Sequence, residues 1–305
     1  MVEQITSAEQ LSGRAKGGDH WDDVITSKKP VFDLRLREIW KYRDLLYLIV
    51  KRDFIALYKQ TILGPVWFFI QPLLMTLMFT VVFGNIAGIP TDGIPKMVFY
   101  LSGFTVWTYF AEVFKKTATT FKDNQQIFGK VYFPRVIAPI SITITNVLRL
   151  FIQLTLFLGF YFYYLFVEGV DMKPNMYILL FPFLLLLLAA LSIGLGLIVT
   201  SFTTKYRDLV FLLQFGIRMG MYATPVIIPL SQWLEKYSSY KWLALGNPMT
   251  PIIETFRYGF IGKGAFSDTT LIWQYLGYST IFTIVVFVLG LAIFNRTEKN
   301  FMDTV

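Results

Sequence analysis

One short stretch of the chain combines aromatic rings with a positive charge at helical spacing. Phe211, Phe215, Arg218 and Tyr222 are 4, 3 and 4 residues apart, which places all four on one face of a helix. A guanidinium presents a planar fork of donors that matches phosphate oxygens, and the faces of aromatic rings can stack on sugar rings. The four residues therefore form a candidate binding face for phosphate groups and sugars.

Arg218 lies inside an otherwise uncharged stretch, residues 209–234. In a membrane span, such a charge costs at least a few kcal/mol unless it faces water, a counter-charge or protein. We therefore expect Arg218 not to face lipid. The alternative is that it only bonds backbone carbonyls or polar groups of neighbouring helices. Arg149, in the apolar run 136–167, is a weaker candidate because no comparable aromatic stripe surrounds it.

The residues that usually carry catalysis or bind metals are missing from the apolar stretches. The chain has no cysteine, and its one histidine, His20, is in the polar N-terminal region. No Asp or Glu stands in the middle of an apolar run, and no G-x-x-x-x-G-K-[ST] phosphate loop occurs. We predict no catalytic site, no metal site and no cofactor in this chain, so any nucleotide chemistry must come from another chain.

The elements that position these residues are predicted to be membrane-spanning helices. Hydrophobic residues make up 55% of the chain and charged ones 16%, with a mean hydropathy of +0.54, which is too apolar for a soluble domain. Continuously apolar segments indicate helices rather than barrel strands. The fold class is thus an all-α membrane protein with six expected spans, within residues 60–91, 97–111, 136–167, 174–204, 209–234 and 269–295.

The distribution of Lys and Arg predicts the orientation. The two terminal regions and the loops 112–135 and 205–208 hold 20 of them, whereas the loops 92–96, 168–173 and 235–268 hold 6. Positive charge stays inside, so both termini are expected in the cytoplasm. The +8 net charge then follows from topology, and no nucleic-acid partner is predicted.

The domain organisation follows from the same pattern. We expect a polar cytoplasmic tail over 1–32, an amphipathic helix over 33–58, a six-span domain over 60–295 and a cytoplasmic C-terminus over 296–305. The amphipathic helix is predicted to lie in the membrane interface; the alternative is a helix packed on protein. Its apolar stripe consists of Leu36, Ile39, Trp40, Tyr47, Val50 and Phe54.

Two further segments interrupt the apolar pattern. Residues 121–140, between the second and third expected spans, are basic, polar and rich in proline and glycine. Residues 235–268 are apolar only in short pieces, too interrupted to cross a bilayer. In that segment Glu254 and Arg257 are three apart, so on a helix they can pair, and a structural role is favoured over substrate contact.

Six motifs, in order and spacing, resemble the permeases of type-2 ABC exporters, in particular the bacterial polysaccharide branch that exports O-antigen, capsule or teichoic acid. The likeness runs from about residue 45 to residue 296. The motifs are LYKQTILGPVWFFIQPLLMTLMFTVVFG (57–84), YLSGFTVWTYF (100–110), GKVYFPR (129–135), YRDL (206–209), TPV (224–226) and NPMTPIIETFR (247–257).

The resemblance implies a half-transporter in the bacterial cytoplasmic (inner) membrane, with two copies forming a conduit and two ATP-binding subunits, which hold ATP and Mg, driving it. An undecaprenyl-linked polysaccharide is the implied substrate. The stripe of Arg218, with Arg149 as the weaker candidate, is expected to line the conduit. Residues 235–268 are expected to form short re-entrant helices at the outer face.

The resemblance also implies that the loop between the second and third spans is a coupling helix that docks into the ATP-binding subunit. Its polar residues offer contacts and its apolar ones an anchor. The alternative is an ordinary positive-inside loop. The coupling residues expected are Asn124, Gln125, Ile127, Phe128, Val131, Tyr132, Phe133, Tyr206, Arg207 and Asp208.

Two other functions remain open from the sequence. A type-2 ABC exporter of a drug or small lipid has the same skeleton and differs mainly in substrate. A gated ion channel is disfavoured because the spans lack rings of acidic residues or filter-like loops.

Overall fold

The computed structural model describes residues 36–59, 61–124, 128, 133–203, 206, 208–265 and 269–301. These residues form helices and connecting turns, without a strand among them. Five helical segments are long and apolar enough to cross a membrane, and a shorter apolar helix, α10 (Leu209–Tyr222), lies beside them. The five segments are 64–86, Lys96–Ala118 (α5), Ile137–Phe166 (α8), 176–203 and 270–297.

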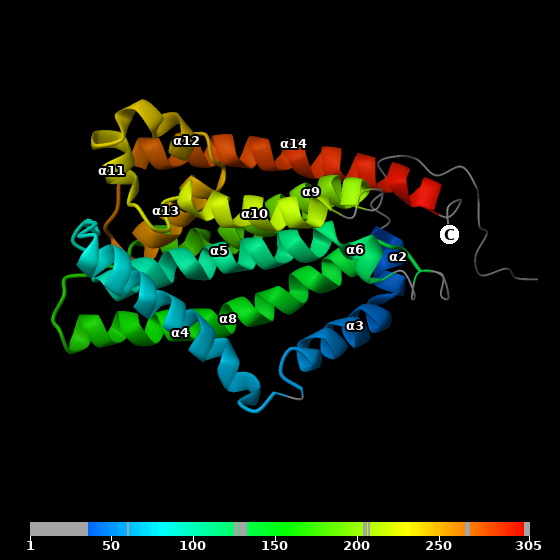
Figure 1. Ribbon diagram of the computed structural model, residues 1–305, viewed down its shortest axis with the longest axis horizontal. Helices are drawn as coiled ribbons and strands as arrows, with labels where there is room; N and C mark the ends of the chain where they lie inside the picture. Colours follow the sequence, from blue (N-terminus) through cyan, green and yellow to red (C-terminus); the bar gives the residue numbers. More distant parts are fainter. Residues whose placement is uncertain are drawn as a thin grey trace, which may run out of the picture. The chain divides into compact units, whose positions relative to one another are not determined.

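Several of these segments are composite. The first joins a 3-10 turn (η2, Gly64–Val66), α4 (Trp67–Phe79) and a π-helical end (η3, Thr80–Ile86). The fourth joins η4 (Met176–Leu180) to α9 (Phe181–Thr203), and the last lies within α14 (Thr269–Phe301). Figure 1 shows α5 between α8 on one side and α9 and α10 on the other.

The expected span 209–234 is not one helix. The helix α10 (Leu209–Tyr222) has 14 residues, about 21 Å of length against the roughly 30 Å of the hydrocarbon layer. Turns follow it, and a new short helix, α11 (Leu230–Glu235), begins after Pro229. The reason is local: Pro225 and Pro229 lack an N–H and push the residues before them out of helical geometry.

Glycine allows the last two long helices to approach closely. A Cβ on Gly290 of α14 would lie 2.5 Å from the carbonyl oxygen of Gly194 in α9. The backbones therefore meet where neither residue carries a side chain, as small residues permit in membrane helix pairs. This contact fixes α14 against α9, on the side of α9 away from α8.

The loops predicted for one side of the membrane do lie together. Lys173 N donates to Ile261 O at 3.1 Å, and Lys263 Nζ donates to Gly93 O at 3.2 Å. Figure 1 shows this end, with α11, α12 (Lys241–Leu245) and α13 (Met249–Ile261), opposite the end that holds α6 (Thr120–Asp123) and α2 (Leu36–Lys41). Following the orientation that the Lys and Arg distribution predicts, we refer to the first as the outer end and to the second as the inner end.

The expected amphipathic helix is two helices, α2 and α3 (Arg43–Ala56), and its predicted stripe is divided. Trp40 and Tyr47 are 70% and 65% exposed, whereas Val50 is buried. The residues that pack on the inner end of the bundle are others, among them Leu45, Leu46 and Ile49. On that face the helix follows the alternative of packing on protein, and its place in the membrane interface stays a prediction.

Candidate functional site

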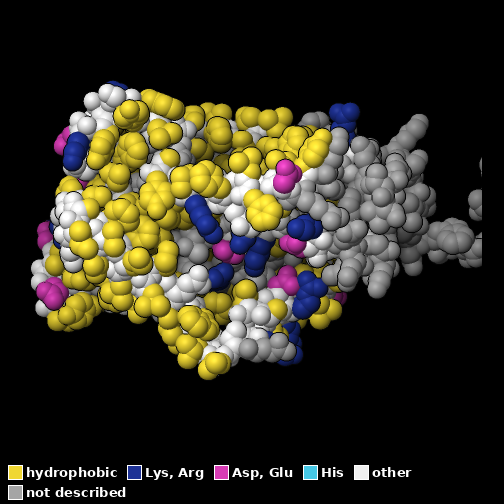
Figure 2. Space-filling view, viewed as in Figure 1, with side chains coloured by type: hydrophobic (Ala, Val, Ile, Leu, Met, Phe, Trp, Pro, Cys, Tyr) yellow, Lys and Arg dark blue, Asp and Glu magenta, His cyan; other side chains and the backbone are white. Residues whose placement is uncertain are grey.

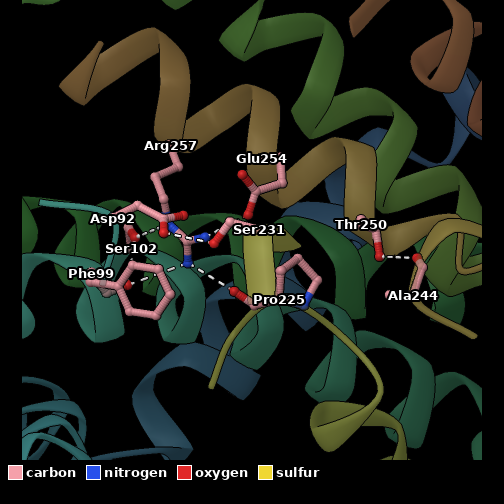
Figure 3. Close-up of polar contacts among 9 residues, drawn as sticks. All are labelled: Asp92, Phe99, Ser102, Pro225, Ser231, Ala244, Thr250, Glu254 and Arg257. Atoms are coloured by element: carbon pink, nitrogen blue, oxygen red, sulfur yellow. Dashed lines mark hydrogen bonds and ion pairs between the residues drawn. The ribbon is translucent and has the colours of Figure 1, made fainter. Parts of the chain in front are cut away.

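The outer end is held together by one buried ion pair (Figure 3). Arg257 Nη1 donates to Glu254 Oε1 at 2.6 Å, and each side chain is 1% exposed. Arg257 Nη2 donates to Pro225 O at 2.9 Å, and Nε donates to Ser102 Oγ at 3.3 Å. The guanidinium carbon also lies 3.9 Å from the centre of the Phe99 ring. These contacts join α13 to α5 and to the turn after α10.

A second polar contact extends this arrangement. Ser231 Oγ, in α11, donates to Asp92 Oδ1 at 2.7 Å, which joins α11 to the loop before α5 (Figure 3). Glu254 and Arg257 thus form the pair that their spacing predicts. Because neither side chain is accessible, the pair can hold the short outer helices in place but cannot touch a substrate in this conformation.

The aromatic stripe lies on the outside of the chain. Phe211, Phe215 and Tyr222 are 76%, 60% and 46% exposed, and Arg218 is exposed as well. In α10 the buried residue is Leu213, on another face. The structure therefore brings the four predicted residues onto one outward face, available to water, lipid or a second copy of the chain.

Arg149 lies in a different setting, between α4, α5 and α8. Its Nη2 donates to Gln71 Oε1 at 3.4 Å, and its Nη1 lies 3.8 Å from Glu112 Oε2. The guanidinium carbon is 5.9 Å from the centre of the Phe68 ring. The Arg149 side chain is 15% exposed, so most of its surface contacts protein and not lipid.

Charged residues gather around Arg149. Glu112, Lys115 and Lys116 stand on α5, and Arg52 and Asp53 on α3 are joined at 2.7 Å. Figure 2 shows Lys, Arg, Asp and Glu side chains collected midway along a face that is otherwise largely hydrophobic. Lys116 interacts electrostatically with Glu112, Arg149, Asp53 and Lys115, and we call these five residues the inner charged patch.

Sequence reasoning found Arg149 but missed its partners. Gln71 and Glu112 are distant from it in sequence, so spacing along one helix gives no sign of them. The one local signal was Glu112 and Lys116, four apart at the end of an apolar run. The second expected span was ended at residue 111 on account of Glu112, whereas the helix continues to Ala118.

Two of the expected coupling residues have an internal role. Phe128 and Phe133 are each 6% exposed and pack with Phe121, whose ring stacks on Phe294 of α14 at 4.9 Å. The guanidinium of Arg135 lies 5.6 Å from the centre of the Phe128 ring. These two rings fill the inner end of this chain in this conformation, and their contact with an ATP-binding subunit stays a prediction.

The other coupling residues are accessible or lie outside the described residues. Asn124 follows α6 and donates from Nδ2 to Thr120 O at 3.0 Å, while Tyr206 and Asp208 are exposed before α10. Four residues of the loop and one before α10 lie outside the described residues: Gln125, Ile127, Val131, Tyr132 and Arg207. Their coupling role stays a prediction.

Within the described residues, no group of three or more His, Cys, Asp or Glu side chains could hold a metal ion.

A family model described as "ABC-2 type transporter" matches residues 44–261. The chain belongs to this family. The match covers α3 to α13, including both arginine sites and the aromatic stripe of α10.

Relatives resemble the permease over most of its length. An O-antigen export system permease protein RfbA of Myxococcus xanthus is 27% identical over 223 residues, 73% of this chain and 82% of that protein. The protein of the same name in Klebsiella pneumoniae is 26% identical over 262 residues, 85% and 94% of the two chains. The polysialic acid transport protein KpsM of Escherichia coli is 24% identical over 251 residues, 79% and 89%.

Proposed function

We propose that this chain is the membrane-spanning half of an ATP-driven exporter that moves lipid-linked polysaccharide across the bacterial cytoplasmic membrane. The observation that carries the proposal is the near full-length likeness to permeases named for O-antigen and polysialic acid export. These names favour a polysaccharide over a drug or small lipid. The outward aromatic face of α10 supports the same conclusion, since its rings suit sugar stacking.

The conduit is formed between two copies of the chain. Support comes from the surfaces left exposed on α4, in the first membrane segment, and on the shorter helix α10. They include Leu74 and Met78 on α4 and the stripe of Arg218 on α10. A charge on such a face is tolerated when it lines a water-filled path. Arg218 and the rings of Phe211, Phe215 and Tyr222 then contact the moving polymer and its phosphate linker.

Energy comes from two copies of a separate ATP-binding subunit, which hold the ATP and Mg; this chain supplies transport without an ATPase site of its own. The family assignment supports such a partner. The subunit docks at the inner end, against the segment around Asn124 and the residues Tyr206 and Asp208. Both termini lie in the cytoplasm, which the excess of Lys and Arg in the inner loops supports.

The test is deletion of the gene in its host. Loss of the surface polysaccharide, with lipid-linked polymer accumulating inside the cell, is the expected result, and a plasmid copy of the unaltered gene should restore export. Normal surface polymer in the deletion strain would contradict the proposal. Copy number is tested separately: a purified complex that contains one permease chain per two ATP-binding chains would exclude the shared conduit.

A further inference from the structure

Arg257 and Arg149 differ in how their guanidinium nitrogens are hydrogen-bonded. Arg257 directs all three of its nitrogens to protein acceptors at its buried position. Arg149 has one long hydrogen bond, to Gln71 at 3.4 Å, and its 3.8 Å separation from Glu112 is too great for another. Its Nε is buried and has no hydrogen-bond partner among the described residues. A buried donor left unpaired in a folded protein calls for a reason, such as a ligand.

The charges around Arg149 favour an anion. Lys116 interacts electrostatically with Arg149, Glu112, Asp53 and Lys115. Its ammonium forms no hydrogen bond or ion pair with the described residues. Asp53 is already paired with Arg52. Arg149 and Lys116, with Lys115 next to Lys116 in the chain, therefore outnumber the one carboxylate here that is not paired with Arg52, that of Glu112, which lies 3.8 Å from Arg149 Nη1.

An apolar groove lies along the part of α8 that follows Arg149 in the chain. It has a volume of about 400 Å³ and lies between α4 and α8, lined by Phe69, Thr155, Leu156, Gly159, Phe160 and Tyr163. Leu156, Phe160 and Tyr163 are 7, 11 and 14 residues after Arg149, so they follow it along one face of α8. A ligand with a charged head and an apolar chain could thus place the head at Arg149 and the chain in the groove, along the same face of α8.

We propose that Arg149, assisted by Lys116 and Lys115, binds the diphosphate of a polyprenyl diphosphate lipid, with the first part of its chain in the groove between α4 and α8. This inference rests on the proposed function, because it names the part of the lipid-linked polymer that the chain recognises. A diphosphate suits three cations better than the single phosphate of a membrane phospholipid does. Glu112 serves as the counter-charge of Arg149 while the site is empty.

The test uses the full chain in nanodiscs of phosphatidylcholine. The probe is fluorescent geranylgeranyl diphosphate, compared with the same label on geranylgeraniol, which lacks the phosphates. Arg149→Gln should weaken diphosphate binding roughly tenfold, because charge-assisted hydrogen bonds are lost, and leave alcohol binding unchanged. Arg149→Lys should give a smaller loss, since it keeps the charge without the fork.

Glu112→Gln separates binding from a merely structural role of the pair. If Glu112 and Arg149 only stabilise the fold, removing the carboxylate leaves diphosphate affinity unchanged or lower. In the proposed site it raises the affinity, since a competing negative charge is gone. The matched control is Lys96→Gln at the other end of α5, where the ammonium donates to Asn85 Oδ1 at 2.8 Å; this change should have no effect.

Three results would overturn the proposal. They are equal binding of the diphosphate and the alcohol, an Arg149→Gln protein that melts like the unaltered one and binds the diphosphate equally well, and displacement of the probe by phosphatidylglycerol as readily as by unlabelled diphosphate. The assay contains no sugar, so it does not depend on export. A deletion strain with normal surface polysaccharide would refute the proposed function while leaving an Arg149-dependent diphosphate site standing.

Discussion

Arg257 and Glu254 form an ion pair at 2.6 Å in which both side chains are almost fully buried. Removal of one partner of such a pair leaves an uncompensated charge, which typically destabilises a protein by about 3–5 kcal/mol. We expect Arg257→Met to lower the melting temperature of the purified permease strongly. The double change Glu254→Gln with Arg257→Met should recover part of that loss, because no buried charge remains.

The control for this pair is Lys173→Met, which removes an exposed charge 3.3 Å from Asp171 at the same outer end. An exposed pair contributes about 0–1 kcal/mol, so the melting temperature should hardly change. Should Arg257→Met melt at the temperature of the Lys173→Met protein, the pair would not hold the outer helices.

Arg218 allows a second prediction, on export. Arg218→Lys keeps the charge but loses the planar fork of donors, and Arg218→Gln loses the charge as well. The amount of surface polysaccharide should therefore be highest with the unaltered chain, lower with Arg218→Lys and lowest with Arg218→Gln. The amount of the protein in the membrane should be the same in all three. Lys236→Gln, which alters an exposed basic residue just after α11, is the control and should export normally. Full export by a well-expressed Arg218→Gln strain would contradict the binding of phosphate by Arg218.

The membrane helices follow from the sequence where a long apolar run decides the structure, as in α9 and in α8, whose run contains one charge, Arg149. The run 209–234 misleads because hydropathy ignores proline, and Pro225 ends the helical region early. Phe128 and Phe133 lie in a basic loop, for which the sequence predicts a docking segment. Their burial depends on Phe294, more than 160 residues away in the chain, and no local pattern reveals such a partner.

The two candidate sites also differ in how far the sequence predicts them. The stripe of Arg218 could be predicted because its four residues share one helix, and spacing alone sets their common face. The surroundings of Arg149 could not, since Gln71, Glu112 and Arg149 come from three helices. Which turn of α4 and α5 meets Arg149 depends on how side chains pack between the helices, and single-helix periodicity carries no information about that.

The inner end provides a third prediction, on coupling. The chain has no native cysteine, so a cysteine at Asn124 or Asp208 would be a unique attachment point. A bifunctional crosslinker there should capture the ATP-binding subunit, and Ile127→Asp should leave ATP hydrolysis uncoupled from export. A cysteine at Glu168, exposed after α8 at the outer end, is the control and should capture nothing. Failure of both inner positions to crosslink would contradict docking at this end.

The contact between Gly290 and Gly194 gives the last prediction. A methyl group at Gly290 would press on the carbonyl oxygen of Gly194 at 2.5 Å, and backbone atoms cannot move aside as a flexible side chain can. Gly290→Ala should therefore separate α9 from α14 and destabilise the permease by about 1–3 kcal/mol. Gly277 is the matched control on the same helix, because a Cβ there meets nothing within 4 Å. Gly277→Ala should be neutral or slightly stabilising, since alanine favours helix over glycine. Thermal unfolding of both purified variants measures the difference, and equal melting temperatures would mean that α9 and α14 do not approach each other at these glycines.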